Sequence, residues 1–365
     1  MTQRSLTPLD GSDVVPYATS RRTPWQVAHA CLKNLALQDI ALLSMLAWLS
    51  FLAVVRVGGS GADAARGPIL TLLGCTACAL LLTRGRLIKE QPLRALLYRS
   101  SMFCSIGGSY FALGPLLPAL NAKLLDPELL RIDTLLFGKT PAVWLEPFVT
   151  HASVEWFAFF YYSYYVLLGL FVIGALLFDR GQRRYELLLA TALVFSVGHV
   201  GYTFVPGAGP YACPELQFER ALVGGMWWQR VEGAVKVAGA QYDIFPSLHT
   251  GLSVLMGLHA HRFRHTWPFR WCYRATWVWV GNIVISTVFL RWHYGIDLIA
   301  GALLAYGAQR VARAFWPREG ARDGQQVQLV WEPVLPRALS PAQAKWLNGV
   351  FGLQLFACLI LLVSS

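Results

Sequence analysis

Charged residues are scarce in this sequence. Asp, Glu, Lys and Arg make up 14% of its 365 residues, and hydrophobic residues make up 55%. Soluble domains carry about 25% charged residues. The mean hydropathy of +0.46 also shows that apolar residues predominate in this chain. The composition therefore excludes an ordinary soluble enzyme and indicates an integral membrane protein.

Recognisable metal-binding patterns are absent as well. The closely spaced cysteines Cys75 and Cys78, in CTAC, have no second cysteine pair and no histidines at zinc spacing. No acidic cluster of the Asp-x-x-x-Asp kind, which suits magnesium, stands at the end of an apolar run. We therefore expect no metal ion and no other cofactor, and we interpret the cysteines as small, buried apolar residues.

The sequence also lacks a compact basic patch interleaved with aromatic residues, although its formal net charge is +11. The arginines stand in short clusters between apolar runs, which is typical of membrane topology and not of nucleic-acid binding. Residues 1–35 contain no short apolar core followed by a small-residue cleavage site. We expect no nucleic-acid partner and no cleaved signal peptide.

Apolar runs account for most of the chain. Nine are long enough, or nearly so, to cross a bilayer core of about 30 Å: 36–55, 68–83, 100–120, 156–178, 187–205, 246–260, 275–290, 296–312 and 347–364. The second run is short, so eight spans are the alternative. The sequence predicts an all-α integral membrane protein, a polytopic helical bundle of about eight to nine spans. Its expected parts are a cytoplasmic N-terminal arm (1–35), N-terminal membrane spans (36–120), a catalytic membrane domain (121–315), a cytoplasmic linker (316–346) and a last span (347–365).

The charges of the loops orient these runs. Basic residues dominate the loops after the second, fourth and sixth runs, whereas 121–154 and 206–245 carry acids as well. The positive-inside rule makes the former cytoplasmic and the latter exterior. Three separated segments then emerge on the exterior face, where a bundle can build one site: FVPGAGPYAC (204–213), FPSLHT (245–250) and LRWHYGID (290–297). We expect a bacterial inner membrane protein whose site lies on the exterior, periplasmic face.

The segment FPSLHT has the properties of an anion-binding helix start. Pro246 suits the first turn of a helix, where its missing N–H costs nothing. Ser247 and His249 then lie among the free N–H groups of that turn. This pattern predicts a phosphate-binding serine and a histidine able to transfer protons.

The segment LRWHYGID supplies a nucleophile. His293 and Asp297 are four residues apart and would share one face of a helix. The carboxylate can accept a proton from one ring nitrogen and leave the other lone pair free, while Arg291 can hold a phosphate oxygen. We predict in-line attack of His293 on phosphorus, with His249 as general acid and then as general base.

Structural roles are the alternative for such residues. A single histidine at a membrane interface is usually a hydrogen-bonded structural residue, and charged residues at span ends commonly snorkel. The structural interpretation is the one we give to His199, His259, His261 and His265. The order of the two segments and their common predicted face favour a chemical role for His249, His293 and Asp297.

At these residues the sequence resembles the type 2 phosphatidic acid phosphatase superfamily. PSLH (246–249) and STVFLRWHYGID (286–297) are similar to its second and third motifs. The resemblance implies a membrane domain with catalytic His249, His293 and Asp297, and with Ser247 as a phosphate ligand. The third motif departs from the family at Thr287, where an arginine is usual. In place of the first motif's lysine and arginine the chain has GYTFVPGAGPY (201–211), so the usual phosphate cage is depleted.

These departures are similar to the inositol phosphorylceramide synthase-like branch, as are LLRIDTLLFGKTPAVWLE (129–146) and FFYYSYYVLLGL (159–170). In the depleted cage, Arg291, Gly209 and Tyr211 are our further candidate substrate ligands. The alternatives are a tight turn for GAGP and an interfacial aromatic belt for the tyrosines.

The function expected from the residues and the resemblance is a metal-independent membrane phosphotransferase that works through a phospho-histidine. It would move a phosphorylated, phosphoinositol-like head group from a phospholipid donor to a lipid alcohol acceptor such as ceramide or diacylglycerol. A lipid phosphate phosphatase, acting on phosphatidic acid or a polyprenyl phosphate, uses the same histidines and is the first alternative. An inactive transporter or scaffold is the second.

Overall fold

A computed structural model describes residues 23–55, 60–120, 123–179, 181–238 and 242–323. Within these ranges the chain is helical, and its β-type pairing is one isolated bridge between Gly207 and Asp243. The all-α prediction is therefore confirmed for the described part. The predicted linker beyond residue 323 and the predicted last span lie outside it.

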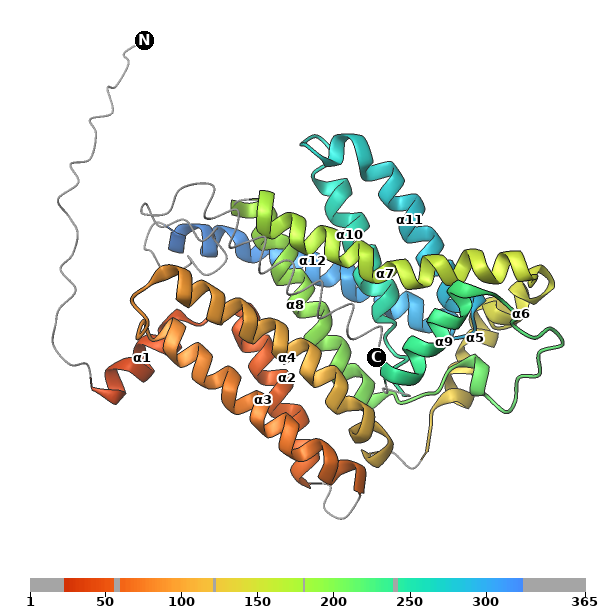
Figure 1. Ribbon diagram of the computed structural model, residues 1–365, viewed down its shortest axis with the longest axis horizontal. Coiled ribbons are helices and arrows are strands. Elements are labelled where there is room, and N and C mark those ends of the chain that lie inside the picture. Colours follow the sequence, from red (N-terminus) through yellow and green to blue (C-terminus); the bar gives the residue numbers. More distant parts are fainter. Residues whose placement is uncertain (1–22, 56–59, 121–122, 180, 239–241, 324–365) are drawn as a thin grey trace, which may run out of the picture.

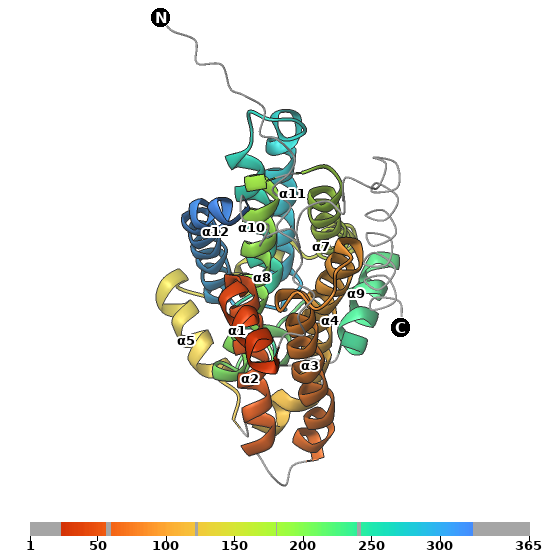
Figure 2. The ribbon, with the colours of Figure 1, turned by 90° about the vertical axis from the view of Figure 1, so that its left-hand side faces the viewer.

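Four helices form the N-terminal part: α1 (Pro24–Asn34), α2 (Leu37–Val55), α3 (Ser60–Arg84) and α4 (Gln91–Leu120). Helix α1 lies within the predicted polar arm, and a capping box between Thr23 and Gln26 starts it. At one end of the bundle, Arg84 Nε lies 2.6 Å from Asp39 Oδ2, and both side chains are buried. Figures 1 and 2 show α2, α3 and α4 side by side, with α1 at one end.

The remaining helices build the second part. They are α5 (Asp126–Phe137), α6 (Pro141–Leu145), the 3-10 turn η1 (Glu146–Phe148), α7 (His151–Phe178), α8 (Gly181–Phe204), the 3-10 turn η2 (Pro210–Ala212), α9 (Met226–Ala238), α10 (Leu248–Arg262), α11 (Phe269–Phe289) and α12 (Gly295–Asp323). Helix α8 is the centre, because it packs against α2, α4, α7, α10 and α12. It therefore joins the two parts of the bundle (Figure 1).

Five of the described helices are long and apolar enough to cross a membrane: α2, α3, α4, α7 and α8. The second apolar run, short in the sequence, belongs to the 25-residue helix α3 because its less apolar beginning, GADAARG, is helical too. Helix α10 has 15 residues, fewer than the roughly 20 that a bilayer core needs. An integral membrane protein is supported, while the count of eight to nine spans is not confirmed.

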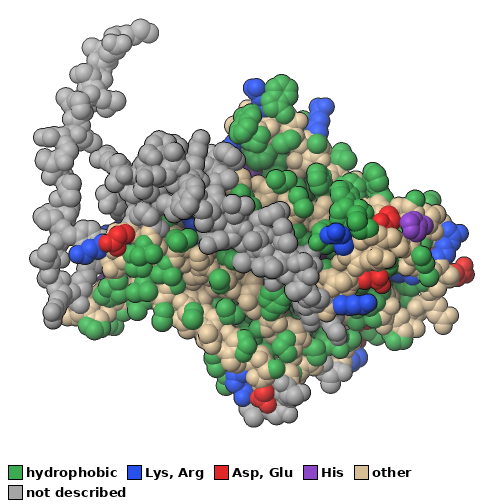
Figure 3. Space-filling view, in the orientation of Figure 1, with side chains coloured by type: hydrophobic (Ala, Val, Ile, Leu, Met, Phe, Trp, Pro, Cys, Tyr) green, Lys and Arg blue, Asp and Glu red, His purple; other side chains and the backbone are tan. Residues whose placement is uncertain are grey.

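Large apolar side chains point outward from the helices. Phe51 on α2, Leu170 on α7 and Leu303 on α12 are all more than half exposed. Figure 3 shows hydrophobic side chains spread over one face, with charged ones mainly toward its edges. Such extended apolar surface suits contact with lipid tails.

Two helix ends differ from the sequence predictions. Helix α10 starts at Leu248 with Ser247 as its N-cap, so Pro246 precedes the helix and does not lie in its first turn. Helix α12 continues through Pro317 to Asp323, into the predicted linker. A proline ring excludes one intrahelical hydrogen bond without always ending a helix.

Candidate active site

The site lies where α8 and α11 end and α10 and α12 begin. Helices α10 and α12 touch there through glycines: a Cβ on Gly301 would lie 2.4 Å from the Ser247 carbonyl oxygen, and one on Gly251 would lie 3.1 Å from the Gly301 oxygen. The Ser247 N–H donates to the Asp297 carbonyl oxygen at 3.1 Å. The helix starts that carry His249 and Asp297 are thus held together by backbone contact.

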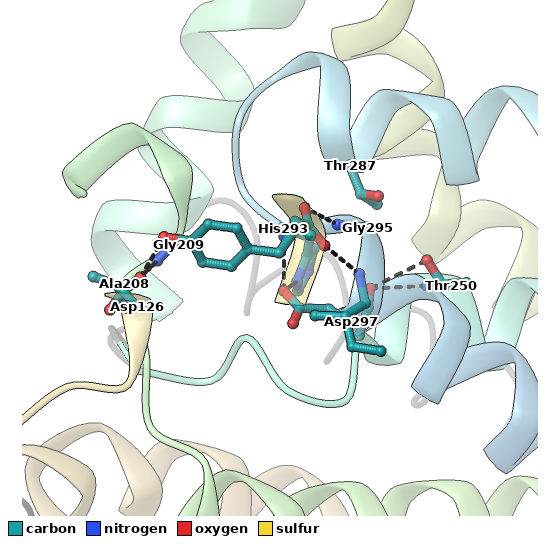
Figure 4. A network of polar contacts seen from close by, with 12 residues as sticks. Asp126, Ala208, Gly209, Thr250, Thr287, His293, Gly295 and Asp297 are labelled. Atoms are coloured by element: carbon teal, nitrogen blue, oxygen red, sulfur yellow. Dashed lines mark hydrogen bonds and ion pairs between the residues drawn. The ribbon is translucent and has the colours of Figure 1, made fainter. Parts of the chain in front are cut away.

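His293 and Asp297 come together through a turn. His293 precedes α12, so the two residues do not share a helical face as the spacing predicted. Nevertheless His293 Nδ1 lies 3.4 Å from Asp297 Oδ2, which also accepts the Tyr294 N–H at 2.8 Å (Figure 4). The His293 N–H donates to the Thr287 carbonyl oxygen at 3.2 Å. The carboxylate therefore faces Nδ1, and Nε2 lies on the other side of the ring.

His249 lies in the first turn of α10 between two tyrosine rings. The centroids of Tyr161 and Tyr164 are each 4.3 Å from that of the imidazole. Its Nε2 is buried and has no hydrogen-bond partner among the described residues. The ring centroids of His249 and His293 are 6.5 Å apart, and both rings line one cavity. A single phosphoryl group can therefore contact both histidines.

Ser247 and Arg291, the predicted phosphate ligands, have protein partners in this structure. The Ser247 hydroxyl caps α10 by accepting the Thr250 N–H at 3.3 Å, and it is fully buried. Arg291 Nη2 donates to the Arg220 carbonyl oxygen at 2.6 Å and lies 3.4 Å from Glu146 Oε1. Burial lowers the pKa of Arg291, and Glu146 opposes this effect. Arg291 lines the cavity and Ser247 does not; that either residue binds phosphate stays a prediction.

Gly209 and Tyr211 lie against the turn that carries His293. Gly209 has a φ of 96°, and a Cβ there would lie 2.5 Å from the Trp292 carbonyl oxygen, so glycine is required on both counts. The Tyr211 N–H donates to the Arg291 carbonyl oxygen at 3.0 Å. The structure thus brings GAGP to the predicted site, where it supports the turn before α12.

Two aspartates of α5 hold this turn, and no sequence pattern identified them. Asp133 accepts the N–H groups of Gly295 and Ile296, at 2.8 and 2.9 Å, and so caps α12. Asp126 accepts the Gly209 N–H at 2.8 Å and the Tyr294 hydroxyl at 3.0 Å. The seven-residue spacing of the two aspartates on α5, which places them on one helix face, is the signal that could have revealed them.

The cavity has a volume of about 620 Å³ and extends well beyond the histidines. Most of its walls are apolar side chains of α4, α7 and α8, among them Met102, Leu168 and Phe195. Its polar lining includes Asp243, whose Oδ2 accepts the Tyr110 hydroxyl at 2.8 Å. Asp243 lies in the loop before α10, and burial raises its pKa to about 6 despite the Tyr110 hydrogen bond and the charge of His293.

Within the described ranges, no group of three or more His, Cys, Asp or Glu side chains is placed to hold a metal ion. Metal independence stays a prediction about activity.

A comparison with protein-family models gave a match to the PAP2 superfamily over residues 127–311. Comparisons with curated proteins and with solved structures gave no significant match. The matched segment runs from the first turn of α5 into α12 and includes His249, His293 and Asp297. It has 185 residues, just over half of the 365. The chain therefore belongs to the PAP2 superfamily.

Proposed function

We propose that the protein is a membrane-embedded lipid phosphotransferase that works through a phosphorylated His293. It transfers a phosphorylated, phosphoinositol-like head group from a phospholipid to a lipid alcohol such as ceramide or diacylglycerol, as in the inositol phosphorylceramide synthase-like branch. Membership of the PAP2 superfamily supports lipid phosphatase or phosphotransferase chemistry. We propose a bacterial inner membrane location with the site on the periplasmic face, supported by the charge asymmetry of the loops.

The observation that carries this proposal is the continuity between the two histidines and the apolar walls. The lining positions run from 99 to 111 on α4, from 161 to 176 on α7 and from 188 to 202 on α8. At 1.5 Å per residue each row is roughly 18–23 Å long, longer than half of a bilayer core of about 30 Å. A lipid tail can lie along these walls while its phosphoester reaches His293.

In the first step, His293 Nε2 attacks the phosphorus of the donor. The bond between phosphorus and the diacylglycerol oxygen breaks, and protonated His249 gives its proton to that oxygen. Diacylglycerol leaves, and the head-group phosphate stays bonded to His293. Asp297, facing Nδ1, keeps the ring oriented and stabilises its positive charge.

In the second step the acceptor alcohol takes the place of diacylglycerol. Neutral His249 removes the hydroxyl proton while the oxygen attacks phosphorus and the P–N bond breaks. His249 is then protonated again and His293 is free, so the cycle closes without an outside proton donor. If the donor is a phosphomonoester such as phosphatidic acid and water enters in place of the alcohol, the same cycle is a phosphatase.

The test is to incubate the purified full chain with phosphatidylinositol in mixed micelles, with and without ceramide, and to identify the lipids by mass spectrometry. We expect inositolphosphoryl-ceramide and diacylglycerol when ceramide is present, and no new phosphosphingolipid from His293→Ala. His265→Ala, which changes an exposed histidine away from the cavity, is the matched control and should retain activity.

Three other outcomes would contradict the transferase. Release of inositol phosphate at the same rate with and without ceramide would indicate a hydrolase that uses water as the acceptor, and release of inorganic phosphate from phosphatidic acid or a polyprenyl phosphate would indicate a phosphatase. Equal, background-level signals from the wild type and His293→Ala, for this donor and for phosphatidic acid and a polyprenyl phosphate, would indicate an inactive scaffold.

A further inference from the structure

Asp243 is a carboxylate of the cavity to which the two-step mechanism gives no role. It lies outside the helices, three residues before Pro246, and the bridge to Gly207 fixes its backbone beside the GAGP loop. Its side chain is half-buried and lines the same cavity as His249 and His293. The carboxylate therefore faces whatever occupies the space next to the phosphoryl group.

The surroundings of Asp243 are rich in hydroxyl groups. The Tyr110 hydroxyl donates to Oδ2 at 2.8 Å. The hydroxyls of Tyr165, Tyr202 and Tyr211 lie within electrostatic range of the carboxylate, and all three tyrosines line the cavity. Among the described residues, no lysine or arginine forms an ion pair with Asp243. One carboxylate and several phenols thus lie near the two histidines, in a cavity whose lining is mostly apolar.

Such a group of side chains matches a ligand with several hydroxyls. An ionised carboxylate only accepts hydrogen bonds, while a phenol both donates and accepts. A carboxylate that loses contact with water when a ligand enters must find donors on that ligand, so a ligand that supplies O–H groups is favoured there. Tyr110 holds one oxygen of Asp243, which keeps the carboxylate in a fixed position for a ligand hydroxyl.

We propose that Asp243, oriented by Tyr110, binds a hydroxyl group of a polyhydroxylated head group, such as a cyclitol, a sugar or glycerol, on the lipid substrate. This rests on the proposed function, since it assigns the part of the donor that lies beside the phosphoryl group. It makes Asp243 a specificity-determining residue that selects head groups by their O–H donors.

A quaternary ammonium head group fits the observations less well. Recognition of such cations uses the open faces of aromatic rings. His249 stacks on Tyr161 at an interplanar angle of 18° and packs against Tyr164, so it covers one face of each ring.

Binding of short-chain lipids without turnover provides the test. In a His293→Ala background, the purified full chain is titrated with dioctanoyl-phosphatidylinositol or dioctanoyl-phosphatidylcholine. The total tryptophan fluorescence is followed, to which Trp228 and Trp292 of the cavity lining contribute. Adding Asp243→Asn should weaken phosphatidylinositol binding by about 10- to 100-fold, the effect of losing a hydrogen bond to a charged group. Phosphatidylcholine binding should change by less than about threefold.

Glu128→Gln, in the same background, is the matched control. Glu128 is a carboxylate near the exterior loops that is exposed and pairs only with Lys123, and its replacement should change neither affinity. Tyr110→Phe should reproduce a smaller part of the Asp243→Asn effect on phosphatidylinositol.

Three outcomes would overturn the assignment. Equal weakening of both lipids by Asp243→Asn would show a general structural role, and greater weakening of phosphatidylcholine would show a cation site. Unchanged phosphatidylinositol affinity would show that the carboxylate does not contact the head group. Because binding needs no catalysis, these results are distinct from a failure of the transfer assay that tests the proposed function.

Discussion

Replacing Asp133 tests whether the cap of α12 positions the candidate catalytic residues. Asp133 is fully buried, and its two oxygens accept the N–H groups of Gly295 and Ile296 and the Thr140 hydroxyl. Loss of a helix N-cap costs about 0.5–2 kcal/mol, and a buried N–H without a partner costs about 1–3 kcal/mol. For Asp133→Ala we expect a loss of about 3 kcal/mol in the free energy of unfolding.

The same change should reduce turnover. Gly295 and Ile296 stand between His293 and Asp297 in the chain, so a shift of their backbone alters the 3.4 Å contact between Nδ1 and Oδ2. A misplacement of about 1 Å at a reacting group costs on the order of a hundredfold in rate. We therefore expect about a hundredfold lower rate for Asp133→Ala, and a smaller loss for Asp133→Asn, which keeps one acceptor oxygen.

The assay measures thermal unfolding in detergent and lipid transfer well below the unfolding temperature. About 3 kcal/mol corresponds to a decrease of roughly 6–12 °C for a domain of 150–250 residues. Glu128→Gln, on the exposed face of the same helix α5, is the control and should behave as wild type. If Asp133→Ala unfolds at the wild-type temperature and keeps wild-type turnover, the cap does not position the site.

Three further predictions concern the general acid, the need for a metal ion and the pH dependence of stability. His249→Ala should retain more activity on an aryl phosphodiester, whose phenolate leaves unprotonated, than on a phospholipid, for which we expect a loss of about 10²–10⁴; equal losses would contradict its role as general acid. EDTA should leave turnover unchanged, and a loss restored by magnesium would show a metal requirement. Asp243 has a pKa raised to about 6 by burial, opposed by the Tyr110 hydrogen bond and the His293 charge, so its ionisation opposes folding. Protonated Asp243 makes its full contribution to the free energy of unfolding below about pH 4, and this contribution is lost as the pH rises to about 6. Relative to Asp243→Asn, wild-type unfolding temperatures should fall over that interval and then level off, and a relative rise would show the opposite sign.

Much of the candidate site could be predicted from short segments. His249 and His293 each stand beside an apolar run, and the alternation of loop charges placed both segments on one face. The pairing of His293 with Asp297 was predicted through a shared helix, although a turn produces it. The prediction of this contact was correct because a turn that enters a helix brings residues four apart together, as a helix does.

The supporting residues could not be predicted in this way. Asp126 and Asp133 contributed only to the charge of a loop that the sequence predicts to be exterior, but the packing of α5 against α12 makes them buried acceptors. Asp243 and its hydrogen-bond partner Tyr110 are 133 residues apart in the sequence. Contacts between distant elements depend on how helices pack, and no periodicity within one segment contains that information.

Because of the glycine contact between α10 and α12, the geometry of the reacting groups and the shape of the apolar cavity walls depend on different residues. Backbone atoms of Gly251, Gly301 and Ser247 fix the relation of the helices that carry His249 and Asp297. The apolar walls belong mainly to other helices, α4, α7 and α8. Substitutions along those walls can therefore adapt the protein to lipids of different tail length or shape, while the geometry of the reacting groups is inherited unchanged.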